Sequence, residues 1–364
     1  MVWLRGHVTV DQDTSLSAQT FKYWEIFLSW LFKYPSRCYE LKRDEAPLLY
    51  ENPSEELFRF GKTYRLRFAS KGIICRVTPS FKDIEKVVEV LKDIYDTIDN
   101  PLLSEWATSE VLAKVMAYRN LKEGYKIPLP IVGEDGRMEM TTYVVDRVFD
   151  LWNKIRAFGL IRFDGGKSSP IILFRGTDFS IMREGGRASM ISDLDPQGPG
   201  WSLFQQGQTV LRAWFKKVGG GVRVIGHSLG GAVGAYTLIH EKKWISQKPH
   251  ELSYLFNSPG ISEEFLKKWN QIEEKPPLRG FICRGDLVSK FGKLFGDVYE
   301  LSLEKPLSPM RAHEMLFFSE RRIYLHQVNL KGENLSSSRQ FYSKILGQTS
   351  SIIYKFGLKF LFPH

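Results

Sequence analysis

The stretch VRVIGHSLGGAVGAYTLI, residues 222–239, decides the fold of this chain. Its first residues are apolar and mostly β-branched, and its second half is rich in small and apolar residues. This pattern predicts a buried strand that passes directly into a helix. Gly226 and Gly230 stand two positions before and after Ser228, where they remove the Cβ atoms that would collide in so tight a turn. We therefore expect Ser228 at a strained position at the edge of a sheet.

Other glycine-rich turns have different requirements. A dinucleotide-binding loop is excluded because the glycines lack the G-x-G-x-x-G spacing, and a P-loop because no lysine follows them. An ordinary strand–turn–helix with Ser228 as a helix cap remains the alternative. The flanking strand and helix patterns favour a nucleophile elbow, with Gly226 and Gly230 as its glycines.

Downstream and upstream of this stretch, short apolar runs alternate with helical patterns. Strand-like runs cover 170–176, 222–226, 254–260, 279–286 and 297–303. This alternation predicts an α/β fold with a mostly parallel central sheet, whose functional groups lie at the carboxyl ends of the strands. We expect a catalytic domain over 121–330, an N-terminal mixed α/β extension over 1–120 and a basic amphipathic segment over 331–364.

A serine nucleophile needs a base and an acid that orients the base, and after an elbow of this kind both usually follow the serine. Two aspartates follow Ser228. Asp286 ends an apolar run and is expected at the carboxyl end of its strand, whereas Asp297 precedes a run and is expected at the opposite edge. Asp286 is therefore the predicted acid, with a helix- or turn-capping role as the alternative.

Three histidines follow Asp286. His326 lies in an alternating, strand-like run, and His364 is the last residue of the sequence. His313 follows the last core strand through a loop, from which its side chain can reach back to Ser228. His313 is therefore the predicted base, and His326 is the alternative.

An acyl-transfer site also needs donors for a negatively charged oxygen. The backbone N–H of Leu229, at the start of the predicted helix, is one donor. The run IILFRGT, residues 171–177, predicts the second, because Gly176 permits a sharp exit from the strand and Thr177 offers an N–H and a hydroxyl. Leu229 and Thr177 are therefore the expected oxyanion hole.

These motifs resemble the class 3, or fungal-type, lipases of the α/β-hydrolase fold. The resemblance covers roughly residues 120–330 and rests on IILFRGT (171–177), VIGHSLGGA (224–232), FNSPG (256–260), RGDLV (284–288) and His313. It implies a triad of Ser228, Asp286 and His313, an oxyanion hole of Thr177 and Leu229, and a lid over 178–200. The chain departs from the family at 200–204, where GWSLF replaces a V-H-x-G-F-like sequence, and in lacking a proline after the acid.

The resemblance implies cleavage of the carboxyl esters of lipids, of the triacylglycerol lipase or phospholipase A type, through an acyl-enzyme on Ser228. The sequence has no cluster of metal-ligand residues, so neither a metal nor a cofactor is expected. An acyltransferase with the same triad is the first alternative. The second is a lipid-binding protein on an inactive hydrolase scaffold.

The charge of the chain is concentrated near its end. The net charge is +10, and residues 321–364 contain seven basic residues and one acid. A basic segment attracts anionic lipid or nucleic acid, but the chain has neither zinc-knuckle spacing nor an RNP-like aromatic motif. We therefore expect peripheral contact with anionic membranes and no nucleic-acid partner.

Two further observations concern location. Residues 21–34 and 344–362 combine wide aromatic faces with lysine stripes, so these predicted helices either pack on the protein or lie in a membrane interface. The N-terminus does not resemble a signal peptide, and no apolar run approaches the ~18–20 residues of a membrane-spanning helix. Cys38, Cys75 and Cys283 lie too far apart in sequence to suggest a disulfide framework. The expected location is cytoplasmic or exported without a cleavable signal peptide.

Overall fold

The computed structural model describes residues 84–133, 135–152, 155–177, 195, 197–286, 288–303, 307–317, 322–328 and 330, and the strand backbones at 48–49 and 63–67. The chain divides into two compact units, residues 1–44 and 45–364, and all described residues lie in the second. Four predicted features lie outside the described residues: the helix at 21–34, the helix at 344–362, the basic segment 331–364 that contains the second helix, and nearly all of the lid segment 178–200.

In the described part of the chain, eleven strands form one sheet in the order β1-β2-β11-β10-β9-β8-β7-β6-β5-β4-β3. The strands are β1 (Leu48–Leu49), β2 (Thr63–Arg67), β3 (Lys126–Val132), β4 (Met138–Trp152), β5 (Ile155–Arg162), β6 (Ile171–Phe174), β7 (Arg223–His227), β8 (Ser253–Phe256), β9 (Leu278–Cys283), β10 (Asp297–Ser302) and β11 (Arg322–Gln327). Strands β6 to β10 are parallel to one another. They therefore share one carboxyl edge.

The sheet is mixed, so the expectation of a mostly parallel sheet holds for its centre and not for the whole. Strands β3 to β6 pair antiparallel, as do β11 with β10 and with β2. The physical reason lies in the connections. Only residues 133–137 join β3 to β4, and only 153–154 join β4 to β5, whereas a parallel pairing needs a crossover of about a dozen residues or more.

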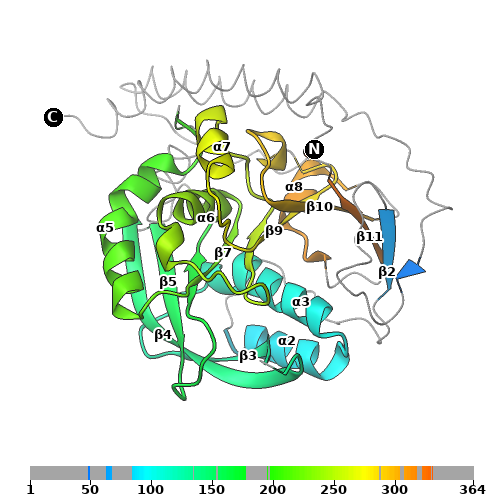
Figure 1. Ribbon diagram of the computed structural model, residues 1–364. Coiled ribbons are helices and arrows are strands. Elements are labelled where there is room, and N and C mark those ends of the chain that lie inside the picture. Colours follow the sequence, from blue (N-terminus) through cyan, green and yellow to red (C-terminus); the bar gives the residue numbers. More distant parts are fainter. Residues whose placement is uncertain are drawn as a thin grey trace, which may run out of the picture. The chain divides into compact units, whose positions relative to one another are not determined.

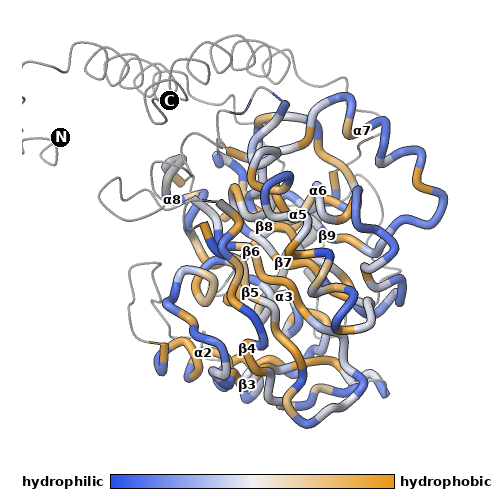
Figure 2. Tube along the Cα trace, turned by 90° about the vertical axis from the view of Figure 1, so that its left-hand side faces the viewer, coloured by the Kyte–Doolittle hydropathy of each residue, from blue (hydrophilic) through white to orange (hydrophobic). Residues whose placement is uncertain are grey.

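Helices cover both faces of the sheet (Figure 1). Alternate residues of each central strand point to opposite faces; in β7, Ile225 belongs to one hydrophobic cluster and Val224 to the other. The first cluster contains α2 (Ile84–Thr97) and α3 (Pro101–Lys114), and the second contains α5 (Trp201–Lys217), α6 (Leu229–His240) and α7 (Glu263–Asn270). Figure 2 shows the central strands as the hydrophobic interior between these two layers.

The helices α2 and α3 are integral to this core. Val87, Leu91 and Ile94 of α2 are buried at helical spacing, and α3 packs against β3, β7 and β8. The domain boundary expected near residue 120 stays a prediction. The structure places α3 in the same hydrophobic cluster as Ile225 of β7 and Phe256 of β8.

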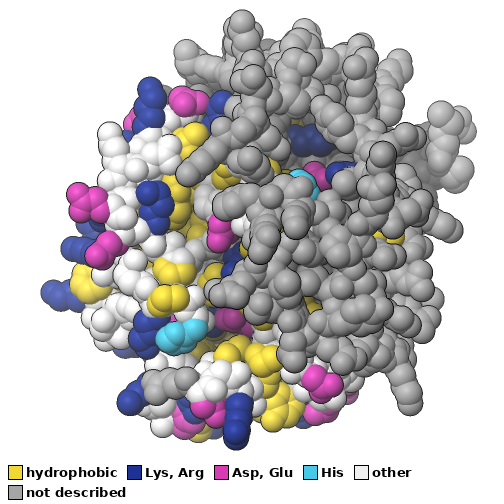
Figure 3. All heavy atoms as spheres, turned by 45° about the vertical axis from the view of Figure 1, so that its right-hand side comes forward, with side chains coloured by type: hydrophobic (Ala, Val, Ile, Leu, Met, Phe, Trp, Pro, Cys, Tyr) yellow, Lys and Arg dark blue, Asp and Glu magenta, His cyan; other side chains and the backbone are white. Residues whose placement is uncertain are grey.

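The described surface carries mixed charge. Basic and acidic side chains are interspersed over the described part of the face in Figure 3. Of the helices that the structure describes, none combines the length and apolar character needed to cross a membrane.

Candidate active site

Ser228 lies between the end of β7 and the start of α6, at the carboxyl edge of the parallel strands. Its backbone has φ 56° and ψ −130°, a conformation that costs a residue with a side chain about 1–3 kcal/mol. The two glycines make this turn sterically feasible. A Cβ atom on Gly226 would lie 2.5 Å from the carbonyl oxygen of Gly230, and one on Gly230 would lie 2.5 Å from that of Phe174.

The three side chains predicted as nucleophile, base and acid form one hydrogen-bonded chain. Nε2 of His313 lies 2.8 Å from Oγ of Ser228, and its Nδ1 lies 3.0 Å from Oδ1 of Asp286. His313 is carried by α8 (Pro309–Glu314), and all three residues are buried. With a proton on Nδ1 facing the carboxylate, Nε2 is the acceptor for the serine proton. This geometry meets the requirement for a serine activated by a base.

Asp286 is held as an anion by several donors. Besides His313, it accepts hydrogen bonds from the amide Nδ2 of Asn257 and from the backbone N–H groups of Val288 and Ser289. Burial by itself raises the pKa of this carboxyl. The charge and hydrogen bond of His313, with the bonds from Asn257 and Val288, outweigh that effect, so the pKa of Asp286 is lowered. The carboxylate is therefore ready to stabilise a protonated His313.

Asn257 is a further residue of the site and is not among those predicted from the sequence. It follows β8 with φ 47°, and its amide donates both to Asp286 (2.9 Å) and to the carbonyl oxygen of Ala312 (3.0 Å). It thus connects the acid to the residue before His313. Its signal in the sequence is an asparagine directly after the strand next to β7, because asparagine tolerates positive φ better than most residues.

His227, the residue before the nucleophile, contacts the backbone of the base. Its Nε2 lies 3.0 Å from the carbonyl oxygen of His313, and its Nδ1 lies 3.0 Å from the hydroxyl of Tyr118. A carbonyl can only accept, so Nε2 carries the proton and Nδ1 accepts from Tyr118. Burial, followed by the charges of His313 and Lys114, lowers the pKa of His227 well below its usual value. His227 is therefore neutral and cannot replace His313 as a proton carrier.

Thr177 and Leu229, the expected oxyanion donors, flank the serine. Leu229 is the first residue of α6, and the first N–H groups of a helix have no acceptor within it. Thr177 is buried and follows Gly176, where a Cβ atom would lie 3.3 Å from Cβ of Ser228 and 2.7 Å from the carbonyl oxygen of His227. The strand exit at Gly176 therefore runs directly beside the nucleophile.

The other downstream aspartate and the alternative base do not lie beside Ser228. Asp297 is the first residue of β10, at the amino edge of the parallel strands. His326 lies within β11, where it pairs with Glu300 of β10 and with Thr63 of β2. His364 lies outside the described residues. The structure thus brings Asp286 and His313 to Ser228, and their catalytic roles stay predictions.

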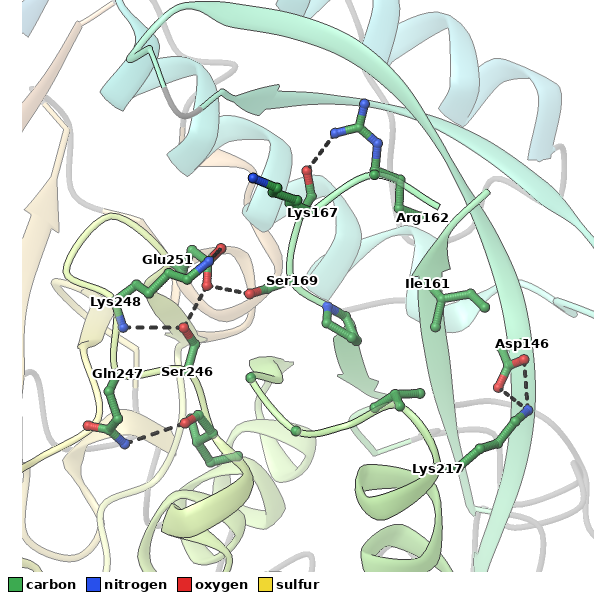
Figure 4. A pocket seen from close by; sticks show the side chains of 17 residues that line it. Asp146, Ile161, Arg162, Lys167, Ser169, Lys217, Ser246, Gln247, Lys248 and Glu251 are labelled. Atoms are coloured by element: carbon green, nitrogen blue, oxygen red, sulfur yellow. Dashed lines mark hydrogen bonds and ion pairs between the residues drawn. The ribbon is translucent and has the colours of Figure 1, made fainter. Parts of the chain in front are cut away.

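A pocket of about 590 Å³ lies at the other edge of the sheet (Figure 4). It is lined by Ser169 and Glu251, which precede β6 and β8. Two ion pairs lie within its lining: Lys217 contacts Asp146 at 2.9 Å, and Lys248 contacts Glu251 at 3.1 Å. Because Ser228 follows β7 at the carboxyl edge, this pocket is separate from the candidate site.

No family model and no curated protein matches the chain. Solved structures of fungal lipases resemble it in part. A triacylglycerol lipase from Penicillium expansum has 14% identity and a TM-score of 0.30, over 44% of this chain and 70% of that one. The Rhizomucor miehei lipase with its propeptide has 16% identity and a TM-score of 0.31, over 55% and 65%. Another fungal lipase has 13% identity and a TM-score of 0.40, over 64% and 87%. Similarity this low to solved structures carries no argument about the function of this chain.

Proposed function

We propose that this protein is a serine hydrolase that cleaves carboxyl esters of lipids through an acyl-enzyme on Ser228. The observation that carries the proposal is the continuous chain from Oγ of Ser228 through His313 to the buried carboxylate of Asp286, with bonds of 2.8 and 3.0 Å. Three hydrogen-bonded side chains whose serine lies at a strained turn between a strand and a helix are the arrangement of an α/β-hydrolase nucleophile.

The reaction follows from these positions. Nε2 of His313 takes the proton of Ser228 as Oγ attacks the ester carbonyl carbon, and Asp286 stabilises the resulting imidazolium. The N–H of Leu229 and the donors of Thr177 hold the oxyanion. When the C–O bond breaks, His313 returns the proton to the leaving alcohol. Water then attacks the acyl-enzyme by the same steps and releases the acid.

The lipid part of the proposal has a different support. It rests on the resemblance of residues 171–177 and 224–232 to class 3 lipases. The ester chemistry, in contrast, is supported by the side-chain geometry alone. The two parts are therefore tested separately.

A fluorophosphonate probe tests the chemistry. We expect labelling of the wild-type protein at Ser228, located by mass spectrometry of the modified peptide, and turnover of p-nitrophenyl esters. Ser228→Ala should abolish labelling and lower kcat by roughly 10⁴-fold or more. Ser262→Ala, at the N-cap of α7, is the matched control and should label like the wild type. A wild-type protein that neither labels nor turns over esters, with or without lipid, contradicts the proposal.

Ester chain length and presentation test the substrate class. A lipid hydrolase should prefer long acyl chains, and emulsified or vesicle-bound esters over the same esters as monomers. A preference for short, soluble esters would replace the lipid assignment with a general esterase.

A further inference from the structure

A buried ion pair lies behind the segment that carries His313. Nζ of Lys114 donates to Oε1 of Glu110 at 2.8 Å, and both side chains are 1% exposed. Lys114 is the last residue of α3, and Glu110 lies one helical turn before it. Burial lowers the pKa of Lys114, and the charge and hydrogen bond of Glu110 counteract that effect. Two charges so deeply buried are retained at a high desolvation cost.

Both partners also bond to the backbone just after His313. Nζ of Lys114 donates to the carbonyl oxygen of Met315 at 2.7 Å, and Oε1 of Glu110 accepts from the N–H of Phe317 at 2.9 Å. Nζ of Lys114 also lies 3.6 Å from the ring centre of Phe317. Each of these bonds spans about two hundred residues of sequence. The pair therefore fixes the chain two and four residues beyond the base.

The segment that these bonds hold has little stability of its own. The helix α8 has six residues, Pro309 to Glu314, and Met315 is its C-cap. A helix this short depends on tertiary contacts for its position. The ammonium of Lys114 sits on the C-cap carbonyl, where the helix dipole favours a positive charge.

We propose that Glu110 and Lys114 are positioning residues for the base, holding the His313 segment so that Nε2 stays within hydrogen-bonding distance of Ser228. This inference rests on the proposed function. Its physical basis is that a misplacement of about 1 Å in a catalytic group can lower the rate by about 10²-fold. It gives the N-terminal helix α3 a part in the active site that its sequence does not reveal.

A purely structural role of the ion pair predicts a different effect of its removal on activity. Replacing a buried ion pair with apolar residues of similar volume is often neutral or stabilising. If the pair only filled the core, Glu110→Met/Lys114→Met would therefore keep full activity. If it positions His313, the same variant stays folded and loses turnover.

The same helix offers a matched control. Glu105 pairs with Arg223 at 2.6 Å, and both are buried. Arg223 donates to the carbonyl oxygen of Leu252, which precedes β8 and lies at the amino edge of the parallel strands. Glu105→Met/Arg223→Met therefore removes a buried pair from α3 without touching the His313 segment.

The experiment compares kcat and KM for a soluble p-nitrophenyl ester, the rate of fluorophosphonate labelling, and the urea unfolding midpoint. We expect Glu110→Met/Lys114→Met to lower kcat and the labelling rate of the folded protein by about 10- to 100-fold, with KM little changed. Its unfolding midpoint should fall, because the N–H of Phe317 and the carbonyl oxygen of Met315 lose their partners, so the rates are measured at urea concentrations and temperatures where the variant is folded. Glu110→Gln keeps an acceptor oxygen for Phe317 and Lys114 and should stay within about threefold of the wild type. The Glu105/Arg223 control should retain the wild-type kcat.

Three outcomes overturn the inference: a Glu110/Lys114 double variant with wild-type kcat, an equal loss in the control, or a loss of kcat that only parallels a loss of folded protein. If the double methionine variant does not fold, Glu110→Gln/Lys114→Met provides the same test of positioning. It removes the hydrogen bond to Met315 and keeps that to Phe317. A failure of the proposed function is distinguishable, since the wild-type protein itself would then not label at Ser228.

Discussion

Nε2 of His227 lies 3.0 Å from the carbonyl oxygen of His313, so the residue before the nucleophile holds the backbone of the base. The ring centres of the two histidines are 4.8 Å apart. Since Tyr118 occupies Nδ1 of His227, the tautomer that donates to His313 is fixed. A neutral imidazole in this place adds a hydrogen bond without a charge that would repel the protonated base.

The neutrality of His227 makes a prediction about stability and pH. Its pKa in the folded protein is lowered well below the ordinary value of 6.5, so below about pH 6.5 the unfolded chain binds the proton more readily. The contribution of His227 is therefore complete above pH 6.5 and is lost as the pH falls toward the folded-state pKa, by at most about 1.4 kcal/mol per pH unit.

His227→Gln tests this, because the amide can still donate to His313 and does not titrate. We expect the free energy of unfolding, measured with urea between about pH 7 and pH 5, to fall less steeply in this variant than in the wild type. His250→Gln, at an exposed position, should follow the wild-type curve. Parallel curves for His227→Gln and the wild type would show that His227 is not held neutral.

Asp286→Asn should lower kcat by roughly 10⁴-fold with little change in KM. The amide cannot stabilise the imidazolium, and it no longer fixes the proton on Nδ1 of His313. Ester turnover by the purified variant measures the effect. Asp297→Asn, at the opposite edge of the sheet, is the control with unchanged turnover. A loss below tenfold in Asp286→Asn would reject its assignment as the acid.

Asn257→Gly isolates the contribution of the amide, because glycine accepts the φ of 47° without strain. The variant removes the donors to Asp286 and to the carbonyl oxygen of Ala312. A hydrogen bond to a charged group contributes about 1.5–3 kcal/mol, so we expect kcat to fall by about 10- to 100-fold.

Steady-state kinetics check this result, and Asn257→Asp provides a second arm. An added carboxylate beside Asp286 should raise the pKa of that acid and reduce activity further. An aspartate variant more active than the glycine variant would contradict the role of the amide as a donor to Asp286.

The parts of the site that follow local rules were predictable from the sequence. Steric limits at the elbow leave Ser228 between two glycines, and the small number of downstream aspartates and histidines narrows the candidate acids and bases to a few, of which Asp286 and His313 lie beside Ser228. Glu110 and Lys114 have the spacing of an ordinary helical pair, and Asn257 suits a turn with positive φ. Their contacts with the segment around His313 join distant parts of the chain, and neither helical nor strand periodicity records such contacts.

The antiparallel half of the sheet was missed for a different reason. The expectation of a mostly parallel sheet extends the alternation of strands and helices to the whole catalytic domain. The run GEDGR at 133–137, between the apolar strands β3 and β4, is a hairpin signal that indicates the reversal of direction. Whether neighbouring strands run parallel or antiparallel depends on the length of the connection between them. Strand direction is therefore predicted from the loops as well as from the strands.

Two glycines of the parallel strands, Gly226 in β7 and Gly280 in β9, differ in the space available for a side chain. A Cβ atom on Gly226 would meet the backbone of Gly230 and Gly231 at 2.5–2.8 Å, whereas one on Gly280 in β9 would lie 3.4 Å from a Val298 methyl group. Displacing backbone atoms in a close-packed core has a high free-energy cost. Gly226→Ala should therefore reduce the free energy of unfolding by at least about 2 kcal/mol and abolish labelling at Ser228. Gly280→Ala should change it by less than about 1 kcal/mol and leave labelling intact. Urea titrations of both variants measure the difference, and equal effects would mean that the elbow tolerates a side chain at Gly226 and does not constrain Ser228.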